Sequence, residues 1–362
     1  MLRTAAATAA AATTTAAPTS PHRRRHPTGS LSKRPRSGVV LLLIAILLGS
    51  TTHTMLPASA RAAASAAGRT ALRRSSSSSA GGDKVTTIVF DVDDTLYDVA
   101  SGFTAHRNGE VVWRFMVDRL GFPDTATARA VRDEYFAVYH STAKALTVAR
   151  AEGRFPEGAP AFDPKDLSSY WVDHLDYGKL FGTRAHPTEE AAKKAKAAFG
   201  AALAECPCEL VAFSNGPRSY VLKVLDRLSL LELFGTGRSS RDGALVWGVD
   251  DVLPHCKPEA AAFSAVFGEL NAKRRDAGHH DEVVPEECVM VEDSMKNLRA
   301  AKALGMKTVL ITGTGEEGRI LPGDAPSSED PAVDAAFATV EEMVDGLPGL
   351  WRDPPVFEPP KG

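Results

Sequence analysis

The stretch that decides the fold is "FDVDDTL", residues 90–96, which follows directly on the apolar run "VTTIV". The run is short and rich in β-branched residues, which predicts a buried strand. Three carboxylates, Asp91, Asp93 and Asp94, and the hydroxyl of Thr95 come at the end of this strand. Because neighbouring like charges repel one another, the cluster is either a solvated turn or a site where a cation and an anion are bound.

Short apolar runs alternate with helical patterns through the rest of the body. The runs "CELVAF", "ECVMV", "KTVLIT" and "DAAFAT" predict further strands, separated by stretches with helical apolar spacing. This alternation predicts an α/β fold, a Rossmann-like parallel sheet with helices on both faces. The expected parts are a core over 83–98 and 206–346, a helical cap domain inserted after the first strand over 99–205, and a proline-rich tail over 347–362 that trails or wraps irregularly.

The first 82 residues differ sharply from the body in charge. They contain no Asp or Glu and eleven Lys or Arg, whereas the other 280 residues carry 31 basic and 45 acidic side chains, a net of −14. An acidic body without a basic patch predicts no nucleic-acid partner. We expect residues 1–82 to be a targeting segment of low complexity.

The targeting segment contains the apolar run "VVLLLIAILL" at 39–48, followed by the small-residue sequence "ASA" at 58–60 and a second basic, Ser/Ala-rich stretch. A signal-like part followed by a transit-like part predicts a two-step plastid address, and the alternative is a secretory signal. Ten apolar residues are too few to span a bilayer comfortably, so we expect no stable membrane span in the mature protein.

Polar residues follow three of the predicted strands, where ligands bind in open parallel sheets. They are Asp91, Asp93 and Thr95 after the first strand, Ser214, Asn215 and Gly216 after the second, Glu292 and Asp293 after "ECVMV", and Lys257 just before a helix. Carboxylate oxygens suit Mg²⁺. Hydroxyls, backbone N–H groups and the lysine suit phosphate oxygens, and no Gly-x-x-x-x-Gly-Lys loop offers another phosphate site. The pattern predicts a site that can bind Mg²⁺ and phosphate oxygens together.

Four stretches, in this order, resemble the motifs of the haloacid dehalogenase superfamily. "DVDDTLY" resembles the first motif, "AFSN" the second, Lys257 before Pro258 the third, and "MVEDSMKNLRAAKALGMKTVLI" the fourth with its following helix and strand. The long insertion after the first strand is similar to the helical cap of some members. From these residues the chain is identified as a member of this superfamily, which implies a hydrolase.

The resemblance implies a role for each matched residue. Asp91 would be the nucleophile that takes up a phosphoryl group. Asp93 would protonate the leaving alkoxide and later deprotonate the attacking water, and repulsion from its neighbour would let it keep a proton near neutral pH. Ser214 and Lys257 would hold the phosphoryl oxygens. The Mg²⁺ ligands would be Asp91, Asp293, Glu292 and the backbone carbonyl of Asp93.

Within the superfamily the chain looks most like the pyrimidine 5′-nucleotidase branch, on "DVDDTLY" with Tyr97, "DEYFAVYHSTAKAL" and the fourth motif with Asn297. Glu292 departs from the Asp that many relatives of that branch carry. We therefore expect a phosphatase for nucleoside 5′-monophosphates, with a sugar-phosphate or phosphoglycolate phosphatase or a phosphomutase as alternatives. Asp93 argues against a true dehalogenase, which needs no second aspartate. The alternative from another class is a non-catalytic module that binds a phosphorylated ligand or a protein.

Other charged residues are expected to be structural. Asp94 and Asp98 are interpreted as surface turn residues. His140 and Lys144 are expected on the solvated face of one cap helix, four residues apart, and Arg107 on a similar face.

Overall fold

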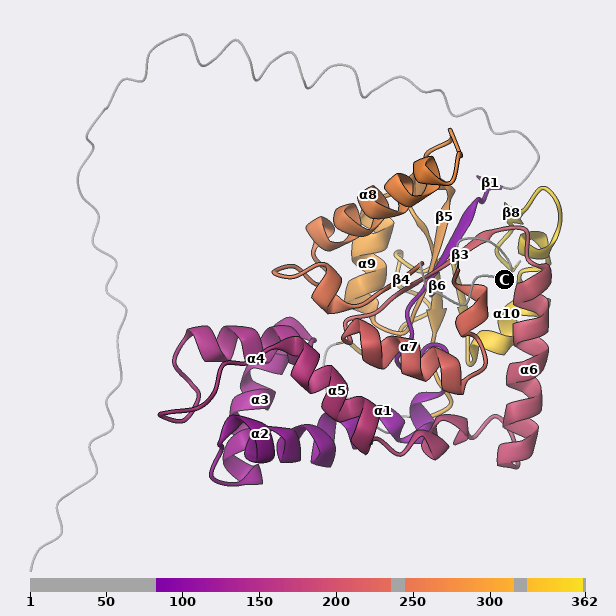
Figure 1. The fold of residues 1–362 in the computed structure, drawn as a ribbon. Coiled ribbons are helices and arrows are strands. Elements are labelled where there is room, and N and C mark those ends of the chain that lie inside the picture. Colours follow the sequence, from indigo (N-terminus) through magenta and orange to yellow (C-terminus); the bar gives the residue numbers. More distant parts are fainter. Residues whose placement is uncertain (1–82, 236–244, 316–323, 361–362) are drawn as a thin grey trace, which may run out of the picture. The chain divides into compact units, whose positions relative to one another are not determined.

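A six-stranded parallel sheet lies at the centre of the computed structural model, which describes residues 83–235, 245–315 and 324–360 (Figure 1). Its order is β4-β3-β2-β5-β6-β7. The strands are β2 (Thr87–Phe90), β3 (Glu209–Phe213), β4 (Val246–Trp247), β5 (Cys288–Glu292), β6 (Lys307–Ile311) and β7 (Ala335–Phe337). The predicted α/β class with a parallel sheet is confirmed. The two-residue strand β4 was not predicted, because it is too short to show a pattern.

Successive residues of the central strand β2 pack on opposite faces of the sheet. Phe90 packs on one face, which α6 (Glu189–Glu205) and α7 (Arg218–Arg227) cover. Val89 packs on the other face, which α8 (Ala260–Asp276) and α9 (Met295–Ala303) cover. All four residues of β2 are buried, as expected for a strand covered on both faces.

The regular elements between β2 and α6 are all helices, which confirms the predicted helical insertion after the first strand. Its elements are η2 (Val99–Ser101), α1 (Phe103–His106), the π-helical turn η3 (Arg107–Val111), α2 (Val112–Leu120), α3 (Thr125–Tyr139), α4 (Thr142–Ala151), α5 (Pro164–His174) and η4 (Tyr177–Phe181). Side chains of Asp124, Ser141 and Asp163 accept hydrogen bonds from the first turns of α3, α4 and α5, which explains where these helices begin.

The last helix of the predicted cap, α6, packs on the sheet. Its Phe199 ring lies edge-on to Phe90 of β2, with the ring centroids 6.3 Å apart. Its Lys196 Nζ donates to the carbonyl of Leu96 at 2.5 Å and pairs with Glu341 Oε1 at 2.5 Å. The helical insertion after β2 comprises α1–α5, whereas α6 packs on the sheet. The domain boundary at residue 205 stays a prediction.

The proline-rich tail is more regular than expected. It forms η9 (Pro348–Trp351) and the strand β8 (Val356–Phe357), which pairs antiparallel with β1 (Asp83–Lys84). Leu350 and Phe357 are buried. The remaining short helices are η5 (Leu231–Leu233), η6 (Val249–Asp251), η7 (Pro285–Glu287), η8 (Val340–Glu342) and α10 (Met343–Gly346).

No helix in the described ranges is both long and apolar enough to cross a membrane. The predicted targeting segment, residues 1–82, lies outside the described residues.

The ion pair between Lys196 and Glu341 gives a test of how α6 is held. Burial raises the pKa of Glu341, but Lys196 and further hydrogen bonds lower it below its usual value. Such a group stabilises the fold above its unfolded pKa, and this stability is lost as the pH falls through the folded pKa. We expect Glu341→Gln to lower the free energy of unfolding at pH 7 by about 1.5–3 kcal/mol.

Urea unfolding at pH 7 and at lower pH measures this effect. The difference from wild type should shrink as the pH falls below the unfolded pKa of about 4.3. It should vanish only below the lowered pKa of the folded state, where the carboxylate is protonated in both states. Glu190→Gln, an exposed carboxylate on the same helix, should change little at either pH. A loss of stability that is the same at all pH values would show that packing, and not the ion pair, is responsible.

Candidate active site

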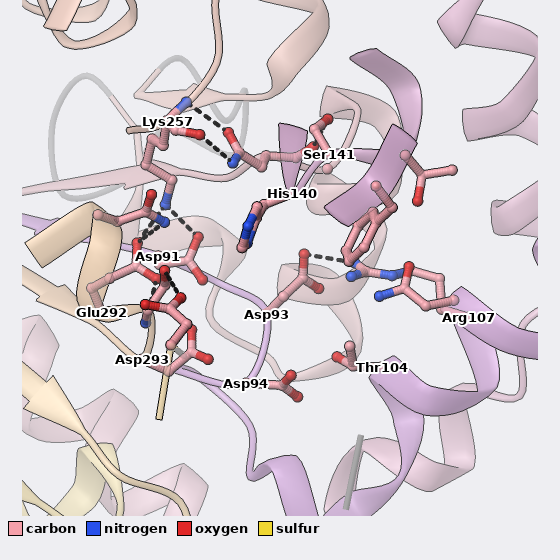
Figure 2. A pocket seen from close by; sticks show the side chains of 18 of the residues that line it. Asp91, Asp93, Asp94, Thr104, Arg107, His140, Ser141, Lys257, Glu292 and Asp293 are labelled. Atoms are coloured by element: carbon pink, nitrogen blue, oxygen red, sulfur yellow. Dashed lines mark hydrogen bonds and ion pairs between the residues drawn. The ribbon is translucent and has the colours of Figure 1, made fainter. Parts of the chain in front are cut away.

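The ammonium of Lys257 lies between two carboxylates at the carboxyl edge of the sheet. Its Nζ donates to Asp91 Oδ1 at 2.6 Å and to Glu292 Oε2 at 2.7 Å (Figure 2). Asp91 follows β2 and Glu292 ends β5, two strands that pair in parallel, so their carboxyl ends lie side by side. Lys257 is fully buried, and the two carboxylates raise the pKa of its amine above the usual value although burial alone would lower it. The lysine therefore stays charged.

Three carboxylates beside this lysine form a cluster that can hold a metal ion. One oxygen from each of Asp91, Glu292 and Asp293 lies within 4.8 Å of the others. Burial, followed by mutual repulsion, raises the pKa values of Asp91 and Asp293 well above their usual range. Three carboxylates and one ammonium have a formal charge of −2, so a divalent cation with oxygen ligands fits this donor set.

Backbone and amide groups hold the cluster in place. Glu292 accepts from the backbone N–H of Ser294 at 3.1 Å and from Asn297 Nδ2 at 3.1 Å. Asp293 accepts from the Thr95 hydroxyl at 3.4 Å. The start of α9 therefore orients the acidic end of β5.

Asp93 points away from the cluster, toward the cap (Figure 2). Its carboxylate pairs with Arg107 Nη1 at 2.6 Å and accepts from the hydroxyls of Tyr97 at 2.7 Å, Tyr220 at 2.6 Å and Ser214 at 3.2 Å. Burial raises the pKa of Asp93, but Arg107 and the hydrogen bonds outweigh it and lower the pKa below its usual value. The expectation that Asp93 keeps a proton near neutral pH is wrong for this arrangement, because its neighbour is a cation.

The residues after β3 position others around the site. The Asn215 amide brackets the backbone of Lys257, donating to its carbonyl at 2.9 Å and accepting from its N–H at 2.9 Å. The Ser214 hydroxyl donates to Asp93 and accepts from the N–H of Gly216 at 2.9 Å. Asn215 and Gly216 line the cavity above the site, whereas Ser214 and Thr95 are not among its lining residues. Phosphate binding by these four residues remains a prediction.

Two aspartates expected on surface turns make structural contacts instead: Asp94 is buried, and Asp98 accepts hydrogen bonds from distant residues. Asp94 is buried, has a positive φ of 58° and lines the cavity. Asp98 caps η2 and accepts hydrogen bonds from Thr183 Oγ1 at 2.6 Å and from the N–H of Thr314 at 3.0 Å. Asp98 thus joins its own segment to those of Thr183 and Thr314.

The expectation that His140, Lys144 and Arg107 lie on solvated faces of the cap is also wrong. His140 ends α3 with a φ of 51°, so it and Lys144 lie on different helices. His140 lines the cavity and accepts from Lys296 Nζ at 2.5 Å. Lys144 is buried and pairs with Glu259. Arg107 is buried against Asp93, and only its place four residues after Phe103 could have indicated this.

These groups surround one cavity of about 150 Å³ between the sheet edge and the cap. The core contributes the acidic cluster and Lys257, and the cap contributes Arg107, His140 and Trp171. The arrangement brings the Asp91 carboxylate, a buried cation, an acidic cluster that can hold a metal ion, and the Asp93 carboxylate to one cavity.

The family comparison agrees with this site. The model of the haloacid dehalogenase-like hydrolases matches residues 85–305, more than half of the sequence. The chain therefore belongs to the haloacid dehalogenase-like hydrolases, as the motifs predicted.

Solved structures with a similar fold have low identity to the chain. The HAD phosphatase from Thermococcus onnurineus is 18% identical over 72% of this chain and 97% of its own, with a TM-score of 0.42. CbbY from Rhodobacter sphaeroides, in complex with phosphate, is 17% identical over 72% and 96%, with a TM-score of 0.43. The L-2-haloacid dehalogenase from Xanthobacter autotrophicus is 16% identical over 72% and 99%, with a TM-score of 0.39. No curated protein matches the chain.

The acidic cluster predicts stabilisation by a divalent metal. A ligand that binds only the folded state at 100 times its Kd stabilises it by about 2.7 kcal/mol. We expect millimolar Mg²⁺ to raise the Tm of the wild type and to have little effect on Asp293→Asn, which has lost a ligand. Asp276→Asn, an exposed aspartate on α8, should respond like the wild type. An equal response of Asp293→Asn would place the metal elsewhere, and Mn²⁺ and Ca²⁺ in the same assay compare the metals.

Proposed function

We propose that the protein is a phosphomonoester hydrolase that acts through an aspartyl phosphate on Asp91. The observation that carries the proposal is the buried ammonium of Lys257, which touches Asp91 and Glu292 beside a metal-binding cluster. A carboxylate flanked by a fixed cation and a bound metal is suited to attack an anionic phosphorus, because both cations offset the repulsion between the two anions.

In the first half of the reaction an oxygen of Asp91 attacks phosphorus, and the bond from phosphorus to the leaving-group oxygen breaks. Lys257 holds charge on the phosphoryl oxygens from its fixed position. Mg²⁺, held by Asp91, Glu292 and Asp293, would supply further neutralising charge. The leaving oxygen takes up a proton, and Asp93 is the acid proposed for this step.

In the second half, water attacks the aspartyl phosphate, which releases phosphate and restores Asp91. The attacking water loses a proton to a general base. Asp93 in its ionised form is suited to this role. To act as an acid in the first half, the Asp93 carboxylate first has to take up a proton, which removes its ion pair with Arg107.

Nucleoside 5′-monophosphates are the substrate class that the sequence resemblance favours. The cavity of about 150 Å³ favours a second candidate, a compact sugar phosphate, because it lies below the roughly 300–1,000 Å³ of pockets that enclose drug-sized ligands.

Phosphate release from a panel of nucleoside, sugar and carboxylic acid monophosphates, with Mg²⁺ and with chelator, tests the proposal. We expect Asp91→Asn to lower turnover by about a thousandfold or more, because the nucleophile is lost. The exposed Asp276→Asn should retain full activity. Full activity of a folded Asp91→Asn would contradict the covalent mechanism. A wild type that hydrolyses no ester would support a non-catalytic binding module.

We also propose that residues 1–82 direct the protein to the plastid. The support is compositional: eleven basic residues and no acidic ones around an apolar run. A fusion of residues 1–82 to a fluorescent protein should accumulate in plastids, and secretion into the medium would favour the alternative of a secretory signal.

A further inference from the structure

The cavity has a side formed by the core and a side formed by the cap. Its lining includes Thr104 from α1, Arg107 and Asn108 from η3, Phe136 from α3, and Trp171 from α5. If the phosphoryl group binds at Lys257 and the acidic cluster, as the proposed function requires, the leaving group of the ester lies against these residues.

Buried polar atoms without a hydrogen-bond partner gather on this cap side. Among the described residues, Asn108 Oδ1, Trp171 Nε1 and Arg107 Nε make no hydrogen bond. Asn108 is 4% exposed and Trp171 is 2% exposed, and both line the cavity. A buried polar atom without a partner costs free energy, so a ligand that supplies the partner is favoured at these atoms. The indole N–H of Trp113 is also unpaired, although Trp113 does not line the cavity. An unpaired indole therefore indicates a ligand less strongly than the unpaired amide oxygen of Asn108 does.

The charge around these atoms decides which leaving group they can accept. Six of the side chains that line the cavity are carboxylates, and two, Lys257 and Arg107, are cations. The charge of Arg107 is already offset by Asp93, 2.6 Å away, and its guanidinium lies over the rings of Trp171 and Tyr220. Acidic groups therefore outnumber basic ones even after a divalent metal is added. A second anionic group on the substrate would be repelled.

A neutral leaving group with hydroxyl and ether oxygens matches what remains. The Asn108 amide can accept from a hydroxyl and donate to an oxygen, and the Trp171 indole can donate. We propose that Asn108 and Trp171 bind the sugar next to the phosphate, and that they select neutral sugar esters over esters that carry a carboxylate. The sugar could be that of a free sugar phosphate or the ribose of a nucleotide, which share this chemistry.

The test compares kcat/KM for ribose 5-phosphate, UMP, phosphoglycolate and p-nitrophenyl phosphate. Wild type should prefer the first two to phosphoglycolate. In Asn108→Ala, the ratio of kcat/KM for ribose 5-phosphate to that for p-nitrophenyl phosphate should fall at least about tenfold, since the lost hydrogen bonds serve only the sugar. Trp171→Phe, which keeps a ring but removes the N–H, should lower the same ratio by about threefold to tenfold. A larger effect on UMP than on ribose 5-phosphate would identify the nucleotide as the source of the sugar.

Trp113→Phe is the matched control, because it removes an unpaired indole N–H outside the cavity and should leave the ratio unchanged. An unchanged ratio in both Asn108→Ala and Trp171→Phe, with both variants folded by circular dichroism, would overturn the inference. If wild type hydrolyses no ester, the proposed function fails separately. Calorimetric binding of ribose 5-phosphate to Asp91→Asn, with and without Asn108→Ala, then still decides the inference. The inference is supported if Asn108→Ala weakens the binding of ribose 5-phosphate about tenfold. It is overturned if the two proteins bind ribose 5-phosphate equally well or if neither binds it.

Discussion

The buried ammonium of Lys257 is the charge on which the acidic end of the sheet depends. Burying a carboxylate without a partner is costly, and here Asp91, Glu292 and Asp293 meet where the strand ends converge. Lys257 contacts two of them, and the Asn215 amide fixes its backbone with two hydrogen bonds. Removing the lysine would leave two buried carboxylates and the half-buried Asp293, and the donors that remain to them among the described residues are amides and a hydroxyl. The lysine also leaves the cluster two negative charges, which is the charge that a divalent cation offsets.

The cap is tied to this centre through charged and polar contacts. Ser141 lies between α3 and α4, and its hydroxyl donates to the carbonyl of Asn215 at 2.9 Å. Lys144 pairs with Glu259, two residues after Lys257. Because these contacts reach the segments that also hold Lys257, the position of the cap and the electrostatics of the site are linked.

The core and its chemistry could be predicted because both are local in sequence. A short β-branched run predicts a buried strand, and parallel strands bring their carboxyl ends together, so Asp91, Glu292, Asp293 and Lys257 could be placed without coordinates. The cap could not be predicted to the same depth. Helical periodicity separates apolar from polar faces, but it does not say which charged residue is buried against a distant partner.

Arg107 shows why the rest was missed. Its partner Asp93 lies fourteen residues before it, and its other neighbour Tyr220 lies 113 residues after it, so no local pattern joins the three. It also sits in a π-helical turn with a non-helical residue at Gly109, where helical spacing no longer predicts direction. The charge of Asp93 could not be predicted for the same reason, since its ionisable neighbours along the chain are the carboxylates of Asp91 and Asp94.

The surroundings of Asp93 constrain how it can take part in catalysis. An ionised carboxylate has about four acceptor sites, and here Arg107, Tyr97, Tyr220 and Ser214 supply four donors. A leaving-group oxygen or a water that exchanges a proton with Asp93 has to replace one of them. Arg107 belongs to the cap and the other three donors lie outside it, so the one cation among these four donors comes from the cap and the three hydroxyls come from the rest of the chain.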